Sequence, residues 1–250
     1  MGWGAVSARG LRVVRTKPVG SLHPVTEFFF LYSMAEIRVI IADDHEIVRQ
    51  GVRKLIESEK DMEVCGEAVS GRDAVELTTR LNPDVAILDI SMPGLNGIEA
   101  TRQILRANSK VRVLMFTMHD AEQLVHEVFS AGAKGYLLKS DAGRHLISAV
   151  RTVASGSHYF SSRLSEVIFD GFLRRDVPHR PADNQQKPSA REREIIQLLA
   201  EGKSNKEVAS LLGISVKTAE THRAAVMRKL GLHSISELVR YAIRNHIIEA

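Results

Sequence analysis

Acidic side chains stand at the ends of two short apolar runs in the sequence, and a lysine ends a third. Asp43 and Asp44 follow the first run, and Asp89 ends the second. Lys139 ends the third. Like charges repel and lose solvation when they gather, so a cluster of carboxylates does not stabilise the fold by itself. It indicates a site for a divalent cation. The isolated lysine indicates a second anion nearby, and together these residues predict phosphoryl chemistry on a carboxylate.

The apolar runs are typical of strands in a buried parallel sheet, because they are short and rich in Val, Ile and Leu. They alternate with amphipathic helical segments, and five such units predict an α/β doubly wound sheet of five parallel strands. Ligand sites of these sheets lie at the carboxyl ends of the strands, where Asp44, Asp89, Thr117 and Lys139 fall. The expected strands are 37–42, 63–68, 84–89, 112–117 and 135–139, and the expected helices are 46–58, 71–81, 97–107, 121–131 and 141–155.

Asp89 is central in this arrangement and is the expected nucleophile, which would attack phosphorus to give an acyl phosphate. A cation such as Mg²⁺ and Lys139 would neutralise charge on the transferring group, and Thr117 could donate a hydrogen bond to its oxygens. The pair Asp43-Asp44 by itself could be a solvated loop, but the polar ends of the other strands favour a site.

His45 and His119 also lie near strand ends, where either could be mistaken for a metal ligand or a phosphodonor. Both are interpreted as loop positions, because Mg²⁺ prefers oxygen ligands.

Length, cysteine content and charge narrow the class of protein. The 250 residues leave room for two domains, and the single Cys65 excludes an intrachain disulfide and indicates a reducing, cytoplasmic compartment. Residues 34–155 carry a net charge of −3 and residues 187–250 a net charge of +4, so the basic end is the candidate for nucleic acid. No apolar run approaches the roughly 20 residues of a membrane span, so no membrane partner is expected. Met34 is the expected natural start, which would make residues 1–33 a disordered tail or an upstream misreading.

Residues 156–187 break the alternation and are expected to form a linker, with a polar, proline-bearing stretch at 176–184. A short helix is possible over 162–173. Residues 188–250 are expected to be a separate, purely helical domain. Capping boxes pair Ser189 with Glu192, Ser204 with Glu207 and Ser234 with Glu237, and Gly202, Gly213 and Gly231 fall at plausible helix ends.

The helix expected over 216–230 has two different faces. Ala219, Val226 and Leu230 lie on one face and suit a core. The other face is small and basic, as in a helix that enters the major groove of DNA, although a solvated face of an ordinary bundle helix would look the same. This second face consists of Lys217, Thr221, Ala224 and Arg228.

Residues 36–155 resemble the receiver domain of two-component response regulators, which implies a flavodoxin-like fold. Five positions match in the correct order, so the resemblance is specific. The matching motifs are Asp43-Asp44, Asp89 followed by Ser91-Met92-Pro93-Gly94-Leu95-Asn96-Gly97, Thr117, and Lys139 after Gly135-Tyr136. The resemblance implies Asp89 as phosphoacceptor, Asp43, Asp44, Asp89 and the Ser91 backbone carbonyl as Mg²⁺ ligands, Lys139 as the charged partner, and Thr117 and Tyr136 as a switch pair.

Residues 188–248 resemble the LuxR-type helix-turn-helix domain, with 205–212 as the scaffold helix and 216–230 as the reader. The matching runs are 189–194, 198–209, 212–215, 217–222 and 229–231, with Thr218-Ala219 where Thr-Val is usual. The implied DNA-binding residues are Lys203, Lys217, Arg223 and Arg228 at phosphates, Thr218 at the helix start, and Glu220, Thr221 and Ala224 at base edges. Candidates for a dimer contact are Leu238, Val239, Ala242 and Ile243, for which the domain core is an equal alternative.

A receiver joined to a LuxR-type domain is the NarL/FixJ arrangement. It implies a transcription factor, not an enzyme, that a sensor histidine kinase switches by phosphorylating Asp89. The expected partners are that kinase, double-stranded DNA, and a second copy of the chain when phosphorylated or DNA-bound. One alternative is a phosphatase with an aspartyl-phosphate intermediate, but Ser91 stands where its acid/base carboxylate would be needed. Another is a phosphorylation-independent or ligand-sensing LuxR-type regulator, but neither needs the complete acidic site.

Overall fold

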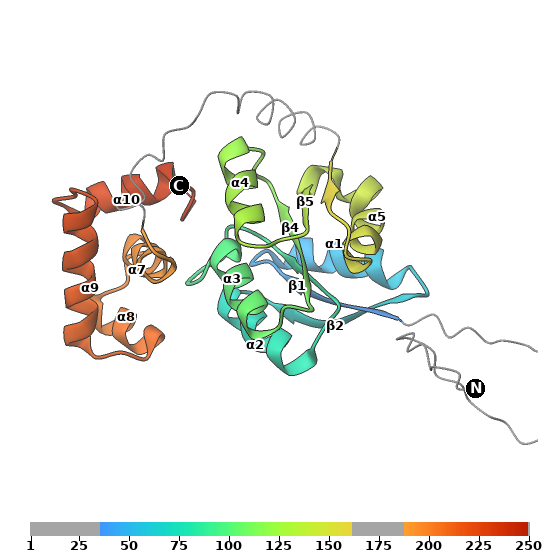
Figure 1. Ribbon diagram of the computed structural model, residues 1–250, viewed down its shortest axis with the longest axis horizontal. Coiled ribbons are helices and arrows are strands. Elements are labelled where there is room, and N and C mark those ends of the chain that lie inside the picture. The colour runs from blue at the N-terminus through green and yellow to red at the C-terminus, as the bar shows by residue number, and fades with distance from the viewer. Residues whose placement is uncertain (1–35, 162–187, 250) are drawn as a thin grey trace, which may run out of the picture.

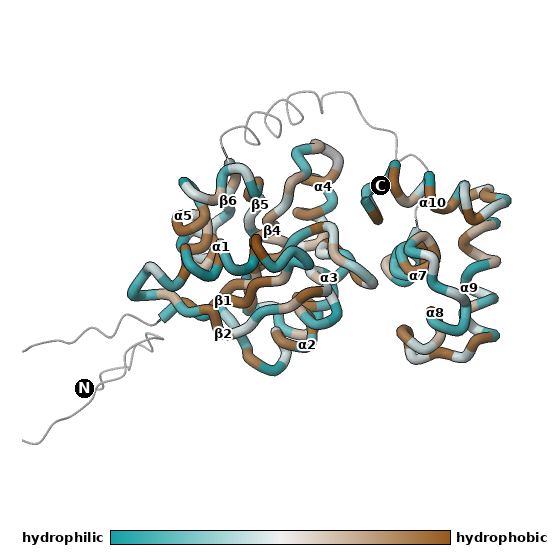
Figure 2. Tube along the Cα trace, turned by 180° about the vertical axis from the view of Figure 1, so that it is seen from behind, coloured by the Kyte–Doolittle hydropathy of each residue, from teal (hydrophilic) through white to brown (hydrophobic). Residues whose placement is uncertain are grey.

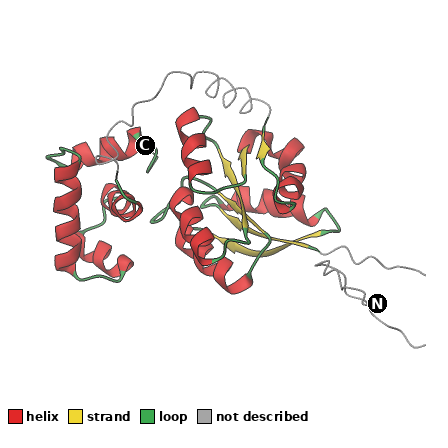
Figure 3. Cartoon of the chain, viewed as in Figure 1, coloured by secondary structure: helices red, strands yellow, loops and turns green. Residues whose placement is uncertain are grey.

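The computed structural model describes residues 36–161 and 188–249, which form an α/β domain and a helical domain (Figure 1). The α/β domain has a parallel sheet in the order β2-β1-β3-β4-β5-β6, with helices on both faces (Figure 3). The predicted fold class is therefore confirmed, with six strands instead of five. The strands are β1 (Ile37–Ala42), β2 (Met62–Ala68), β3 (Val85–Leu88), β4 (Arg112–Thr117), β5 (Gly135–Leu138) and β6 (Tyr159–Phe160).

The additional strand β6 corrects the expected start of the linker at residue 156. Tyr159 and Phe160 pair with the first two residues of β5, and the Phe160 ring lies 4.7 Å from that of Phe129. Two residues are too few to produce a periodic pattern, so neighbouring strands and helices determine this element. The predicted short helix and the rest of the linker lie outside the described residues, as does the predicted N-terminal extension.

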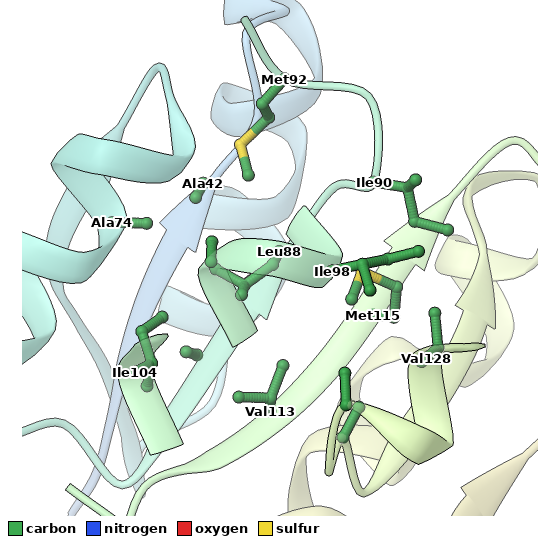
Figure 4. Close-up of a cluster of buried hydrophobic side chains, with 14 of the residues drawn as sticks. Ala42, Ala74, Leu88, Ile90, Met92, Ile98, Ile104, Val113, Met115 and Val128 are labelled. Carbon is green, nitrogen blue, oxygen red and sulfur yellow. The ribbon is translucent and has the colours of Figure 1, made fainter. Parts of the chain in front are cut away.

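Side chains of the central strands alternate between the two faces of the sheet. Ile40 and Ala42 of β1 belong to a buried cluster that includes residues of α2, α3 and α4 (Figure 4 labels Ala42), whereas Val39 and Ile41 belong to a second cluster that includes residues of α1 and α5. The apolar colour of the strands in Figure 2 is consistent with burial on both faces. The helices are α1 (Glu46–Glu57), α2 (Gly71–Leu81), α3 (Gly97–Ala107), α4 (Glu122–Ser130) and α5 (Ala142–Ala154).

The helical domain contains α7 (Ala190–Ala200), α8 (Asn205–Leu212), α9 (Val216–Lys229) and α10 (Ile235–Arg244). The capping boxes predicted at Ser189 and Ser204 are present. At α10 only half of the predicted capping box forms. The Ser234 side chain accepts from the Glu237 N–H, but the Glu237 carboxylate accepts from the backbone N–H of His233, at 2.6 Å, instead of that of Ser234. Across the described part of the chain, no helix combines the length and apolar character that crossing a membrane would require.

Candidate functional site

The predicted acidic site forms at the carboxyl edge of the sheet. Strands β1 and β3 end in register, with Ala42 beside Leu88, so the carboxylates that follow them meet. Asp43 and Asp89 are almost fully buried, with 2% and 4% of their side chains exposed. The Lys139 ammonium joins them, with Nζ 2.7 Å from Asp43 Oδ2 and 2.8 Å from Asp89 Oδ2. The structure therefore brings the predicted nucleophile and the predicted cationic partner into direct contact.

The oxygen donors at this edge fit a hard divalent cation. Ligand atoms of Asp43, Asp44, His45 and Asp89 all lie within 4.8 Å of one another. Asp43 Oδ2 is buried with the Lys139 ammonium 2.7 Å away, and a carboxylate oxygen has a second lone pair that can bind a cation. Three carboxylates with an open, half-exposed side at Asp44 suit Mg²⁺, which binds through a few carboxylates and keeps several waters.

His45 lies closer to this cluster than its interpretation as a plain loop position implied. Its Nδ1 is 2.8 Å from Asp44 Oδ1 and 3.2 Å from Asp43 Oδ1. Its backbone N–H donates to Asp43 Oδ1 at 2.9 Å. The residue also precedes the first turn of α1, so it both starts that helix and orients the acidic pair.

Burial and the Lys139 charge act in opposite directions on Asp89. Burial raises the pKa of the Asp89 carboxyl above its ordinary value, and the nearby Lys139 ammonium only partly offsets this effect. For Lys139, burial lowers the pKa, but the charges of Asp89 and Asp43 outweigh burial and the pKa is raised. Lys139 is consequently a permanent positive charge at neutral pH, as a group that neutralises a transferring phosphoryl must be.

Thr117 and Tyr136, the predicted switch pair, are both fully buried beside the acidic residues. The Tyr136 hydroxyl donates to the backbone carbonyl of His119 at 2.8 Å, and burial raises its pKa. The N–H of His119 donates to Thr117 Oγ1 at 3.3 Å, and its Nε2 lies 3.0 Å from Ser91 Oγ. His119 therefore connects the two switch residues to Ser91, a role that its position in the sequence did not reveal.

The predicted reader helix α9 presents its small, basic face to solvent. Its side chains Lys217, Thr218, Glu220, Thr221, Ala224 and Arg228 are exposed, as is Lys203 before α8. Arg223 is half-buried, and its Nη1 lies 3.5 Å from Asn205 Oδ1. The Thr221 hydroxyl donates to the Lys217 carbonyl at 2.9 Å, within the helix itself.

Burial separates the four candidates for a dimer contact. Leu238 and Ala242 are fully buried in the core of the helical domain and cannot form an intermolecular contact while that core is intact. Val239 and Ile243 are half-buried. The amphipathic spacing of α10 identified an apolar stripe, but it could not distinguish the part that the domain itself covers.

Sequence reasoning missed a polar stripe along α7 and the residue after it, which contacts the α/β domain. Glu194, Gln197 and Glu201 follow helical spacing, and the first two are almost fully buried. The Gln197 side chain bonds to the backbone of Met92 and Asn96, in the loop after Asp89. The spacing is visible in the sequence, but nothing there identifies its partner.

An acidic, lysine-bearing edge on a doubly wound sheet, joined to a helix-turn-helix domain, defines a receiver-regulated DNA-binding protein. Residues 39–151 match the response regulator receiver domain, and residues 188–242 match the bacterial regulatory proteins of the luxR family. The chain belongs to the NarL/FixJ family of two-component transcriptional response regulators.

Relatives and solved structures agree with this assignment over most of the chain. The oxygen regulatory protein NreC of Staphylococcus epidermidis is 39% identical over 217 residues, which cover 85% of this chain and 100% of the relative. NreC of Staphylococcus carnosus is 38% identical over 218 residues, with the same coverage of both chains. A structure of the RcsB response regulator of Salmonella typhimurium aligns with a TM-score of 0.57 at 27% identity, covering 83% of this chain and 97% of that chain. A LuxR-family response regulator from Aurantimonas sp. SI85-9A1 aligns with a TM-score of 0.54 at 35% identity, covering 55% and 99%.

Proposed function

We propose that Asp89 is the phosphoacceptor and that its phosphorylation by a sensor histidine kinase controls DNA binding. The observation that carries this proposal is the buried Asp89 carboxylate held 2.8 Å from Lys139 among further carboxylates. An Asp89 oxygen would form a bond to phosphorus while the phosphorus–nitrogen bond of the donor phosphohistidine breaks. The imidazole leaves with the electron pair, and the product is an acyl phosphate.

Asp43, Asp44, Asp89 and the Ser91 backbone carbonyl would hold Mg²⁺, which when bound neutralises charge on the transferring phosphoryl group. Lys139 supplies a second, fixed positive charge, and because Asp43 also contacts it, the ammonium stays at the site while Asp89 reacts. Thr117 and Tyr136 would report the modification, since both connect to His119 and through it to Ser91.

The exposed face of α9 would lie in the major groove of double-stranded DNA. Lys203, Lys217, Arg223 and Arg228 would contact phosphates, and Thr218 would lie near the backbone at the helix start. Glu220, Thr221 and Ala224 would face base edges. RcsB of Salmonella enterica has been solved bound to a promoter in the presence of the phosphomimetic BeF3−, which supports the same combination here. We place the protein in the cytoplasm, where its DNA is. We also propose that Val239 and Ile243 contribute to a homodimer contact.

Selection from random duplex DNA tests this function directly. The protein is incubated with Mg²⁺, with and without beryllofluoride as the phosphoryl mimic. We expect an inverted repeat to be enriched mainly with the mimic, because a two-fold dimer reads two related half-sites. Equal enrichment in both conditions would contradict control by Asp89, and absence of enrichment would contradict the assignment of α9 as the reader.

Two substitutions on α9 should separate base reading from phosphate binding. Lys217→Ala should weaken binding to all sequences and reduce the salt dependence of log K by roughly one unit of slope, since one phosphate contact is lost. Glu220→Ala should instead relax preference at one base pair, by about 1–3 kcal/mol. Quantitative binding to the selected site and its single-base variants at several salt concentrations measures both effects. An unchanged sequence preference in Glu220→Ala would show that this carboxylate does not read a base.

A further inference from the structure

The helical domain contacts the rim of the acidic site through α7. Arg72 of α2 pairs with Glu194 at 2.6 Å, and Glu99 of α3 pairs with Arg193 at 2.8 Å. Both glutamates are buried at this interface. Buried ion pairs contribute little net stability, but they penalise any arrangement that leaves one partner alone. Each glutamate also pairs with an arginine of its own domain, Glu99 with Arg102 and Glu194 with Arg191, so the two cross-domain pairs help to position α7 but do not alone neutralise either glutamate.

Gln197 holds the backbone of the loop that follows Asp89. Its side chain is fully buried, its Nε2 donates to the Met92 carbonyl at 2.8 Å, and its Oε1 accepts from the Asn96 N–H at 2.8 Å. One side-chain amide thus spans both ends of loop 92–96. The docked helical domain and the phosphoacceptor consequently act on the same short segment of backbone.

Two carboxylates of the helical domain lie at the rim of the acidic site. Glu201, just after α7, accepts from the Gly94 N–H with its oxygens at 2.9 and 3.2 Å. Glu249, after α10, lies 3.1 Å from His119 Nε2, the same atom that is 3.0 Å from Ser91 Oγ. The helical domain therefore brings negative charge to the site from two directions.

Docking leaves the reader helix uncovered. Helix α9 lies on the far side of the helical domain from the sheet, as Figures 1 and 2 show, and its candidate contact residues are exposed in this docked arrangement. The interface between the two domains therefore does not cover α9. What the interface contacts is the loop and the residues that surround Asp89.

We propose that Glu201 and Glu249 form a charge sensor for the state of Asp89. The proposal rests on the proposed function, in which Asp89 carries the phosphoryl group. Phosphorylation converts the Asp89 carboxylate, of charge −1, into an acyl phosphate of charge about −2 at pH 7, so it adds about one negative charge, which repels both carboxylates at the rim. The added repulsion weakens the hydrogen bonds of both carboxylates to the rim, and this shifts the equilibrium toward release of α7 from loop 92–96. The released domain is then free to pair with a second copy.

Amide hydrogen exchange of the full-length chain, followed by NMR with Mg²⁺ present in every sample, tests the sensor. The observed groups are the N–H of Gly94 and of Asn96, which Glu201 and Gln197 cover. In the wild type, beryllofluoride should accelerate exchange at both. In the double variant Glu201→Gln, Glu249→Gln the acceleration should fall roughly fourfold, or about twofold for each charge removed.

The substitutions are chosen to isolate charge. Glutamine keeps an oxygen that can accept from Gly94, so docking itself should persist. Glu36→Gln removes one negative charge at the amino edge of the sheet, where β1 begins, and should behave as the wild type. Gln197→Ala removes the amide without changing charge, so exchange at Asn96 should be faster in all samples while the effect of beryllofluoride on Gly94 persists.

Three results would overturn the sensor. The first is full acceleration of amide exchange by beryllofluoride in the double glutamine variant. The second is fast amide exchange in that variant before beryllofluoride is added. The third is no acceleration of amide exchange in the wild type. The amide resonances of Thr117 and Lys139 report whether beryllofluoride has bound at Asp89. If they shift and exchange does not change, only the sensor is wrong. If they do not shift, the Asp89 assignment is wrong and the sensor is overturned with it.

Discussion

Replacement of Asp89 by asparagine should abolish labelling of the chain by a phosphoryl donor. The amide has nearly the shape of the carboxylate but lacks the anionic oxygen that attacks phosphorus. Labelling with a radioactive small-molecule phosphoryl donor and Mg²⁺ measures the effect, and we expect at least about a thousandfold loss of rate. Asp61→Asn, at a partly exposed position just before β2, should label as the wild type does.

The asparagine variant should remain folded, which makes the loss interpretable. Lys139 keeps its contact with Asp43 at 2.7 Å, and the substitution removes a buried negative charge whose raised pKa shows that ionisation is unfavourable there. Its thermal unfolding midpoint should therefore stay close to that of the wild type. Label retained on Asp89→Asn would show that another residue is the phosphoacceptor.

Replacement of Gly97 by alanine should strongly destabilise the α/β domain. An added Cβ would lie 1.9 Å from the Asp89 backbone oxygen and 2.9 Å from its carbonyl carbon. Neither side can move away, because Asp89 N–H donates to Ala42 O at 2.8 Å and Gly97 N–H donates to Ile90 O at 2.9 Å. We expect a loss of about 4 kcal/mol or more, seen as a fall of about 10 °C or more in the unfolding midpoint.

Gly51→Ala provides the matched control for this substitution. Gly51 lies inside α1, and a Cβ there would meet nothing within 4 Å. Alanine loses less backbone entropy on folding than glycine, so this variant should be about 0.5–1 kcal/mol more stable than the wild type. A Gly97→Ala chain as stable as the wild type would contradict the observed approach of α3 to Asp89.

The sequence by itself determined the elements whose causes are local. Apolar runs and helical spacing located five strands and the helices between them, since burial on both faces and 3.6-residue periodicity both leave a direct trace. The capping boxes at Ser189 and Ser204 followed from hydrogen bonds that reach only three residues. Strand ends then placed Asp43, Asp89 and Lys139 at one edge, because parallel strands share a direction.

The tertiary structure decided the features that depend on partners far away in the chain. Strand β6 exists because β5 offers an edge, and Leu238 belongs to a core because the other helices cover it. The contact between Gln197 and the loop after Asp89 joins residues 101 to 105 positions apart. Periodicity shows which residues share one face of a helix, but not which surface that face contacts. The contacted surface depends on the relative orientation of two folded domains.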